Sequence, residues 1–283
     1  MSDKMNILGI DFEDWFHPQL VQNHIGGMKK EPSVIRGIEK ILDLLRVNES
    51  YATFFVVGEL LEYDPSLLDK IVENGHEIGF HTMHHKRLDS SNPQEFSEEL
   101  AAFDRITNHR SKGFRAPTFS LNQDSAWAID TLIEHNYVYD SSVVPVKTSM
   151  YGLPNAETRP YRITSSSLEK DDANGKLLEF PLATGKFMTK KIPIAGGFYL
   201  RFLPMSTIRR AIYEYEKQDI PATFYIHSWE LTPEYMPRIK MPFKDNFVTY
   251  YNIERAFSKM KHLLENFTFT SFDRFLTRKG LQL

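Results

Sequence analysis

The sequence predicts a single α/β domain built on a parallel sheet or barrel, and two observations support this. Short apolar strands alternate with helical stretches along most of the 283 residues, which is the pattern of parallel α/β folds. A chain of this length with 41% hydrophobic residues can bury one large core, so two small domains are disfavoured. We therefore expect residues 1–283 to form one domain.

The expected strands are short runs rich in apolar, β-branched and aromatic residues. They are residues 6–12, 52–57, 76–80, 113–116, 137–140, 177–181, 222–227 and 267–272. The runs Ala-Thr-Phe-Phe at 52–55 and Ala-Thr-Phe-Tyr at 222–225 echo each other. This similarity suits two equivalent strands of a barrel.

The expected helices lie between these strands and have apolar residues at helical spacing. They are residues 33–46, 65–74, 93–108, a segment capped by Asn122, and residues 205–218 and 252–266. Residues 145–176 are rich in Ser, Pro and Asn without clear periodicity, so we expect a long surface excursion there, with room for a small hairpin. Together the segments make about seven βα units.

Composition excludes several functional classes. The 34 basic and 37 acidic residues give a formal charge of −3, so no broad positive field exists to hold nucleic acid or an anionic membrane. No cysteine is present, so a metal ion would have to be held by histidine and carboxylate side chains. Residues 1–5 do not resemble a secretory signal, and no apolar run approaches the roughly 20 residues of a membrane span. These features predict a cytoplasmic protein; the oligomeric state is left open.

Two histidines form the most informative motif. His81 and His85 stand four residues apart directly after an expected strand, a spacing that lets two imidazoles bind one metal ion. Another expected strand leads into three carboxylates, Asp11, Glu13 and Asp14. Since the carboxyl ends of parallel strands face one common mouth, these side chains are expected to lie close together. Two imidazoles and one carboxylate leave metal positions open for water and a substrate carbonyl, as in catalytic zinc sites.

The same reasoning supplies candidate catalytic groups for a metal-dependent hydrolase. We expect Asp11 to act as the general base and His227, which ends another strand, to protonate the leaving nitrogen. Arg115 follows the expected strand at 113 and would hold the base ionised and oriented.

The identity of the carboxylate ligand depends on where the first strand ends. If the strand stays regular through residue 14, Asp11 and Glu13 share a face and Asp14 points away, which would make Glu13 the ligand or even the base. If a bulge re-aims one side chain as the chain turns into Trp15 and Phe16, Asp14 becomes the ligand. We favour Asp14, with His81 and His85, as the metal ligands.

At these residues the chain resembles the polysaccharide deacetylase family, the NodB-homology carbohydrate esterases of family four, over nearly its whole length. The matching motifs are Asp-Phe-Glu-Asp at 11–14, His-Thr-Met-His-His at 81–85, Arg-Ala-Pro at 115–117 and Tyr-Ile-His at 225–227. The resemblance implies a distorted (β/α)7 barrel holding one divalent metal, usually zinc, through an Asp and two His. It also implies an Asp base, an Arg that orients it and a His acid.

Two further segments, 196–201 and 227–238, resemble the branch of this family found with exopolysaccharide biosynthesis genes. The resemblance implies removal of acetate from N-acetylhexosamine units of a surface polysaccharide or its precursor. The family's adjacent aspartates are separated here, and its fourth motif keeps only Asp140, so the group that tunes His227 is not identified. Two alternatives remain, hydrolysis of another small linear amide, such as a formamide or ureide, and a noncatalytic glycan-binding module.

Overall fold

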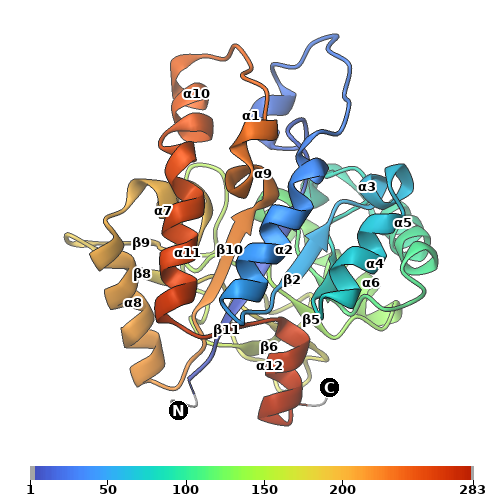
Figure 1. Ribbon diagram of the computed structural model, residues 1–283. Coiled ribbons are helices and arrows are strands. Elements are labelled where there is room, and N and C mark those ends of the chain that lie inside the picture. The colour runs from blue at the N-terminus through green and yellow to red at the C-terminus, as the bar shows by residue number, and fades with distance from the viewer. Residues whose placement is uncertain (1–3, 282–283) are drawn as a thin grey trace.

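The computed structural model describes residues 4–281, and its centre is a strongly curled parallel sheet (Figure 1). The first three residues, which contribute to the prediction that no secretory signal is present, lie outside the described residues. The parallel strands follow the spatial order β10, β1, β2, β3, β4, β5, β7. Their bounds are β1 (Asn6–Phe12), β2 (Thr53–Val56), β3 (Glu77–Phe80), β4 (Gly113–Phe114), β5 (Tyr139–Asp140), β7 (Leu177–Glu179) and β10 (Thr223–His227).

The two ends of this sheet meet through an isolated parallel bridge. Leu182, which follows β7, pairs with Thr223 of β10, and the Ala183 N–H donates to the Thr223 carbonyl at 3.0 Å. The parallel sheet thus curls round until the edge formed by β7 approaches the opposite edge, formed by β10. This arrangement confirms the expected α/β fold as a distorted barrel within a single domain.

The remaining strands extend the sheet or lie apart from it. β6 (Tyr161–Ile163) pairs antiparallel with β7, and β11 (Phe269–Thr270) pairs with the start of β1. A separate hairpin joins β8 (Thr184–Phe187) to β9 (Lys190–Pro193). The expected surface excursion at 145–176 therefore contributes one short strand to the sheet edge.

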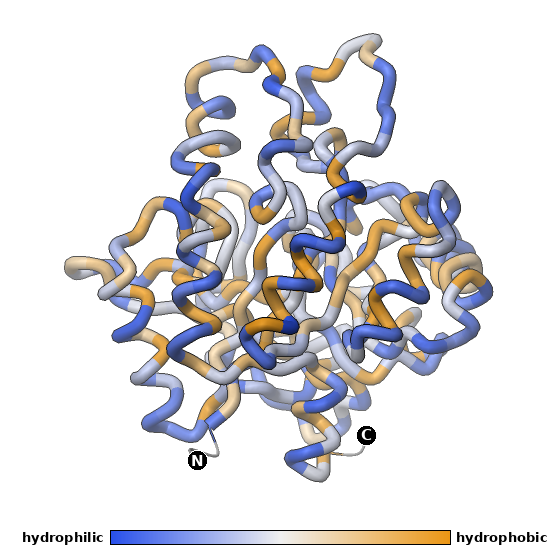
Figure 2. The backbone as a smooth tube through the Cα atoms, in the orientation of Figure 1, coloured by the Kyte–Doolittle hydropathy of each residue, from blue (hydrophilic) through white to orange (hydrophobic). Residues whose placement is uncertain are grey.

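Helices surround the strands and bury their apolar faces against them (Figure 1). The α-helices are α1 (Gln19–Gln22), α2 (Ile38–Val47), α3 (Gly58–Tyr63), α4 (Ser66–Glu73), α5 (Pro93–Ile106), α6 (Trp127–Glu134), α7 (Gly197–Phe202), α8 (Met205–Lys217), α9 (Ser228–Leu231), α10 (Phe243–Tyr250), α11 (Ala256–Asn266) and α12 (Phe272–Lys279). The 3₁₀ turns are η1 (Val34–Gly37), η2 (Leu88–Ser90), η3 (Pro117–Phe119), η4 (Gln123–Ser125), η5 (Pro233–Tyr235) and η6 (Ile253–Arg255). Figure 2 shows hydrophobic residues gathered along the central strands and recurring at intervals around the helices.

The amino-terminal end of the barrel is closed by α12. The sequence predicts a strand through residue 272, but β11 ends at Thr270, and Phe272 instead begins this helix. The Phe272 ring stacks on the Tyr139 ring inside the barrel, with centroids 4.8 Å apart. The prediction fails at this end because a short apolar run indicates only that the segment is buried. Such a run does not distinguish a buried strand from the first turn of a buried helix.

Glycines make room for large side chains inside the barrel. A Cβ on Gly113 would lie 1.9 Å from the Tyr139 ring, and one on Gly9 would lie 2.5 Å from a guanidinium nitrogen of Arg115. Gly9 is followed two residues later by Asp11 on the same face of β1. The strand thus accommodates a buried arginine directly beneath a carboxylate.

A second apolar cluster lies at the carboxyl ends of the strands. Trp15 and Phe16 are 4% and 5% exposed and pack with residues of α9 and of the segment around α10, including Trp229 and Tyr250. Packing anchors these loops over the mouth of the barrel, so the Trp15 and Phe16 rings are core residues. Among the described residues, no helix is both long enough and apolar enough to cross a bilayer.

Candidate active site

The polar candidates meet at one end of the barrel because each lies at, or directly after, the carboxyl end of a parallel strand. Asp11 of β1 pairs in register with His227 of β10. The His81 N–H donates to the Val56 carbonyl at 3.1 Å, directly after β3. The Arg115 N–H donates to the Phe80 carbonyl at 3.0 Å, directly after β4. Strand register therefore places side chains that are far apart in sequence around one point.

Glu13, His81 and His85 form a buried cluster of potential metal ligands. One ligand atom from each lies within 4.8 Å of the others, and His85 Nε2 is 2.8 Å from Glu13 Oε2. The two histidines are not on a helix: Thr82 and His85 adopt left-handed φ values of 59° and 54°, which turn the chain back over the strand end. Within residues 4–281, no second group of three such ligand atoms approaches this closely.

Asp14 does not take the position expected for it. Its carboxylate accepts hydrogen bonds from the backbone N–H groups of Trp15, Ser33 and Ile35, at 2.8 to 3.2 Å. The N–H groups of Ser33 and Ile35 lie at the start of η1, where backbone N–H groups have no acceptor within the turn itself. The expectation that Asp14 would face His81 and His85 is wrong, because Asp14 caps this turn and Glu13 points into the barrel mouth.

The regular alternation of a strand explains this placement. Asp11 and Glu13 lie on the same face of the chain, and Asp14 lies on the other. No bulge re-aims Asp14; instead, the Glu13 N–H leaves the sheet ladder and donates to Ser228 Oγ at 3.1 Å. Trp229 Nε1 then donates to Glu13 Oε1 at 2.9 Å and fixes one carboxylate oxygen.

The cluster fits a divalent metal by the state of its donor atoms. His81 Nδ1 lies 2.7 Å from the Arg115 carbonyl, which can only accept, so Nδ1 carries the proton and Nε2 keeps its lone pair. Burial lowers the pKa of His81 to about 4, which keeps the ring neutral at pH 7. Glu13 Oε2 is buried without a hydrogen bond of good geometry, and burial alone would raise the pKa of Glu13. Its interactions with His85 nevertheless hold that pKa well below its usual range. One carboxylate and two imidazoles are a donor set that zinc accepts.

Asp11 and Arg115 form a buried pair beside this cluster. The Arg115 guanidinium donates to Asp11 Oδ1 at 2.7 Å and to the Ser141 carbonyl and hydroxyl at 3.0 and 2.9 Å. The central carbon (Cζ) of this guanidinium also lies 4.2 Å from the centre of the Phe55 ring. Arg115 is fully buried, so its charge must be paired. Because Ser141 fixes the planar guanidinium, the hydrogen bond from Arg115 holds Asp11 in one orientation.

His227 is held by a carboxylate that sequence reasoning did not identify. Its Nδ1 lies 2.7 Å from Glu230 Oε2, and Arg201 of α7 donates to the other oxygen of Glu230 at 2.6 Å. Burial alone would lower the pKa of His227, but the charge and hydrogen bond of Glu230 outweigh it and raise the pKa to about 9. His227 is therefore protonated at pH 7, as a general acid requires.

Asp140, the part of the fourth motif that this chain keeps, contacts other groups. It accepts from the Ser142 hydroxyl at 2.6 Å and faces the buried carboxyl of Glu179. The groups that contact His227 directly or through Glu230 lie in the two segments already noted in the sequence. Arg201 ends the segment 196–201, and Glu230 lies in the segment 227–238, three residues after His227. Only packing of α7 against α9 shows that these two residues form a pair.

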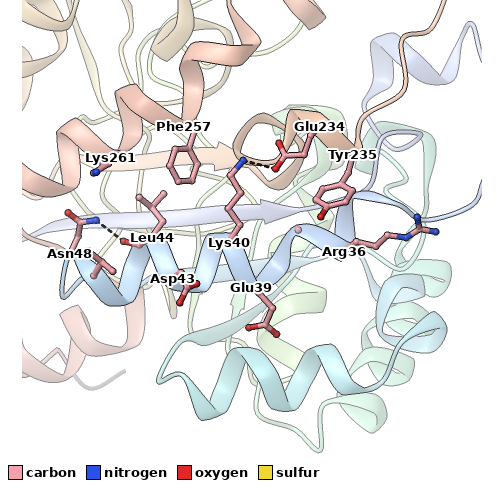
Figure 3. Close-up of a pocket in the computed structure, with 12 residues that line it drawn as sticks. Arg36, Glu39, Lys40, Asp43, Leu44, Asn48, Glu234, Tyr235, Phe257 and Lys261 are labelled. Atoms are coloured by element: carbon pink, nitrogen blue, oxygen red, sulfur yellow. Dashed lines mark hydrogen bonds and ion pairs between the residues drawn. The ribbon is translucent and has the colours of Figure 1, made fainter.

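A cavity of about 130 Å³ opens onto these groups. It is bordered by Asp11, Glu13, His81, His85 and His227, and by side chains of α1, α7 and α10. A larger cavity of about 510 Å³ lies outside the barrel between α2, η5 and α11 (Figure 3). Its Lys40 is paired with Glu234 at 2.6 Å and lies over Phe257. None of its lining residues belongs to the site at the strand ends, so we place the chemistry in the smaller cavity.

Comparisons with known proteins agree with this arrangement. Residues 35–137 match the family model described as polysaccharide deacetylase, and residues 141–277 match a domain of unknown function, DUF3473. A peptidoglycan-N-acetylglucosamine deacetylase of Bacillus cereus is 39% identical over 28% of this chain and 28% of its own length. A chitooligosaccharide deacetylase of Bradyrhizobium is 37% identical over 23% of this chain and 30% of its own length. The chain thus aligns with less than a third of these curated relatives.

A solved structure extends the likeness to the whole fold. The crystal structure of a putative polysaccharide deacetylase from Mycobacterium smegmatis superposes with a TM-score of 0.62 and 14% identity, covering 100% of this chain and 93% of that one. At this identity the likeness concerns the fold. Residues 35–137 thus match the polysaccharide deacetylase family model, and the chain as a whole has the fold of a solved structure described as a putative polysaccharide deacetylase.

Proposed function

We propose that this protein is a metal-dependent deacetylase that hydrolyses the N-acetyl group of N-acetylhexosamine units in a surface polysaccharide or its precursor. The observation that supports this most is the convergence of three arrangements on one cavity. They are the ligand cluster Glu13, His81 and His85, the Asp11–Arg115 pair, and the protonated His227. A glycan-binding module would require none of these buried charges.

In this proposal Glu13, His81 and His85 hold one divalent ion, with Zn²⁺ as the best match to the donor set. When bound, such an ion polarises the acetyl carbonyl and lowers the pKa of water. Asp11 takes the proton from the attacking water, and Arg115 keeps the Asp11 carboxylate aimed at it. His227 gives its Nε2 proton to the sugar nitrogen as the amide C–N bond breaks, while Glu230 stabilises the imidazolium from the other side.

The substrate class is proposed from the relatives and the resemblance together. The matched curated proteins are named as deacetylases of peptidoglycan N-acetylglucosamine and of chitooligosaccharides. The segments 196–201 and 227–238 favour a role in exopolysaccharide synthesis. We further propose that residues 141–277 complete the deacetylase domain begun by 35–137, because His227 lies in the second segment and the metal ligands His81 and His85 in the first. The cytoplasmic location stays a prediction.

The proposal is tested by following acetate release. The full chain is freed of metal with a chelator, incubated with N-acetylchitooligosaccharides, and assayed before and after adding back Zn²⁺. We expect turnover only after metal is restored, and none from Asp11→Asn, which keeps the shape of the side chain but not its basicity. Undiminished release by metal-free protein would contradict the proposal. Hydrolysis of formamides or ureides with no action on acetylated sugars would favour the small-amide alternative.

A further inference from the structure

Two carboxyl groups that the proposed reaction does not use meet inside the barrel, and we call them the carboxyl pair. Asp140 ends β5 and Glu179 ends β7, and these two residues are register partners in adjacent parallel strands. Partners in register turn their side chains to the same face of the sheet. Both residues have an exposed fraction of 0%, so neither carboxyl group contacts solvent.

Each member of the carboxyl pair has one oxygen that accepts from a donor and one that does not. Asp140 Oδ1 accepts from the Ser142 hydroxyl at 2.6 Å, and Glu179 Oε1 accepts from the Val143 N–H at 3.0 Å. Asp140 Oδ2 and Glu179 Oε2 are buried, and within residues 4–281 neither has a donor. The pair therefore holds two buried oxygens whose hydrogen bonds the surrounding chain does not supply.

One proton held between the two carboxyl groups satisfies this arrangement. The side chains of Asp140 and Glu179 lie within hydrogen-bond reach of each other. If both were charged, they would repel each other without any hydration, whereas a shared proton removes the repulsion and gives both free oxygens a partner. Burial raises the pKa of Asp140, and burial together with the charge of Asp140 raises the pKa of Glu179 well above its usual value.

The carboxyl pair holds the short segment that follows β5. The Ser142 hydroxyl, which donates to Asp140, also accepts from the Ala116 N–H at 2.8 Å. Because this hydroxyl has a single proton, it joins these two groups only while Asp140 Oδ1 is an acceptor. The Ser141 hydroxyl donates to the carbonyl of Phe180, directly after β7, at 2.9 Å. The positions of both serines thus depend on the ends of β5 and β7.

Ser141 connects the carboxyl pair to the proposed general base. Its carbonyl and hydroxyl accept from Arg115 at 3.0 and 2.9 Å, and Arg115 donates to Asp11 Oδ1 at 2.7 Å. The residues described around the cavity include neither Asp140 nor Glu179. The pair can therefore act on the base through Ser141 and Arg115, without touching a substrate.

From these contacts we propose that Asp140 and Glu179 share one proton and act as positioning residues for the general base. They keep Ser141 in place, so that Arg115 holds the Asp11 carboxylate in one orientation. This inference rests on the proposed deacetylase function and adds to it two residues outside the cavity. The contacts also join the two matched parts of the chain, because Arg115 lies in the part that matches polysaccharide deacetylase and Glu179 in the part that matches a domain of unknown function.

Amide substitutions test the shared proton, because an amide supplies a donor that does not titrate. In Asp140→Asn the amide oxygen still accepts from Ser142 while the amide N–H donates to Glu179, and Glu179→Gln gives the mirror arrangement. Each single variant should keep a kcat for acetate release from N-acetylchitooligosaccharides close to that of the wild type. In the double variant two NH₂ groups face each other, and flipping either amide breaks its bond to Ser142 or Val143. Its kcat should fall on the order of tenfold to hundredfold, the cost of a slightly misplaced catalytic group, with KM and metal content unchanged.

Two further variants exclude a general effect on folding. Glu77→Gln is the matched control, since Glu77 is also a buried carboxyl group but accepts from the backbone of α12 at the opposite end of the barrel. Combined with Glu179→Gln, it should leave kcat at the wild-type level. Ser142→Ala removes the hydroxyl that Asp140 holds and should lower kcat with the metal retained, so it tests the proposal even if the double amide variant does not fold.

Spectroscopy separates this proposal from the proposed reaction. One infrared band of a protonated carboxylic acid, present in the wild type at pH 7, should be lost in Asp140→Asn and also in Glu179→Gln. The NMR signal of the Arg115 Nε–H group should keep its wild-type position in each single variant and move in the double variant. These results would support the carboxyl pair even if no acetate were ever released. Retention of every carboxylic acid band in either single variant would overturn the proposal. So would a double variant with an unmoved Arg115 signal and a wild-type kcat, or a kcat that falls only together with the metal content.

Discussion

The candidate metal-ligand cluster and His227, the proposed acid, border the same cavity, but different kinds of structure hold them in place. Glu13 and His81 follow strands of the barrel directly, so strand register alone brings them together. His227 also ends a strand, yet its protonation depends on Glu230 of α9 and Arg201 of α7. The comparison teaches that the barrel strands position the candidate ligands, whereas the helices at its mouth supply the charged partners of the proposed acid.

Removing the ligand cluster should have the largest effect. His81→Ala, His85→Ala and Glu13→Gln should each release the metal and lower turnover by about 10³-fold or more, because metal-based charge stabilisation is worth several kcal/mol. Metal content by mass spectrometry and acetate release would be measured together. His84→Ala is the control, since His84 is exposed and contacts the partly buried carboxylate of Glu59, outside the ligand cluster. A Glu13→Gln protein with full metal occupancy would remove Glu13 from the ligand set.

Removing the acid should come next. His227→Ala should reduce kcat by roughly 10²- to 10⁴-fold, the usual contribution of a general acid, while the metal content stays at the wild-type level. Loss of the metal in this variant would show that His227 helps to hold the metal. The comparison between a ligand cluster and a separate acid would then be wrong.

Weakening the support of the acid should have a smaller effect that depends on pH. The Glu230 carboxylate raises the pKa of His227, so Glu230→Gln should lower that pKa, and the protonated acid would be lost at a lower pH than in the wild type. The alkaline limb of the kcat profile should move to lower pH, and activity on that limb should fall about tenfold for each pH unit by which the limb moves. Glu234→Gln, an exposed change in the same segment, should leave the profile in place. An unmoved alkaline limb in Glu230→Gln would mean that Glu230 does not set the proton affinity of His227.

The smallest effect on activity should come from Asp14. Asp14→Ala leaves the N–H groups of Ser33 and Ile35 without their acceptor, which should lower the free energy of unfolding by about 1 to 3 kcal/mol. Denaturant unfolding and metal analysis would be run side by side, with Asp69→Ala as a control for an acidic residue on a surface helix. Metal loss without any loss of stability would restore Asp14 as a ligand.

Much of the fold could be predicted from the sequence because strand and helix periodicity are local properties. The predicted bounds of β1 match the structure, and most other strands lie within two or three residues of their predicted ends. The short helices α7, α9, α10 and α12 are not predicted by periodicity. Each is shaped by what it packs against: Phe272 begins a helix because Tyr139 and Phe180 offer its ring a place inside the barrel.

For the site, sequence alone determined that Asp11, His81, His85, Arg115 and His227 would gather at one end of a parallel barrel, because parallel strands present their carboxyl ends at one edge. Tertiary structure decided that Glu13 faces the cavity, whereas the adjacent Asp14 stabilises the fold by accepting hydrogen bonds from the backbone. Asp14 is held by N–H groups of η1, about twenty residues away in the chain, and His227 is tuned by an Arg201–Glu230 pair from two helices. Such choices depend on hydrogen-bond partners and buried charges that meet only after packing, and the spacing of residues along one chain does not encode them.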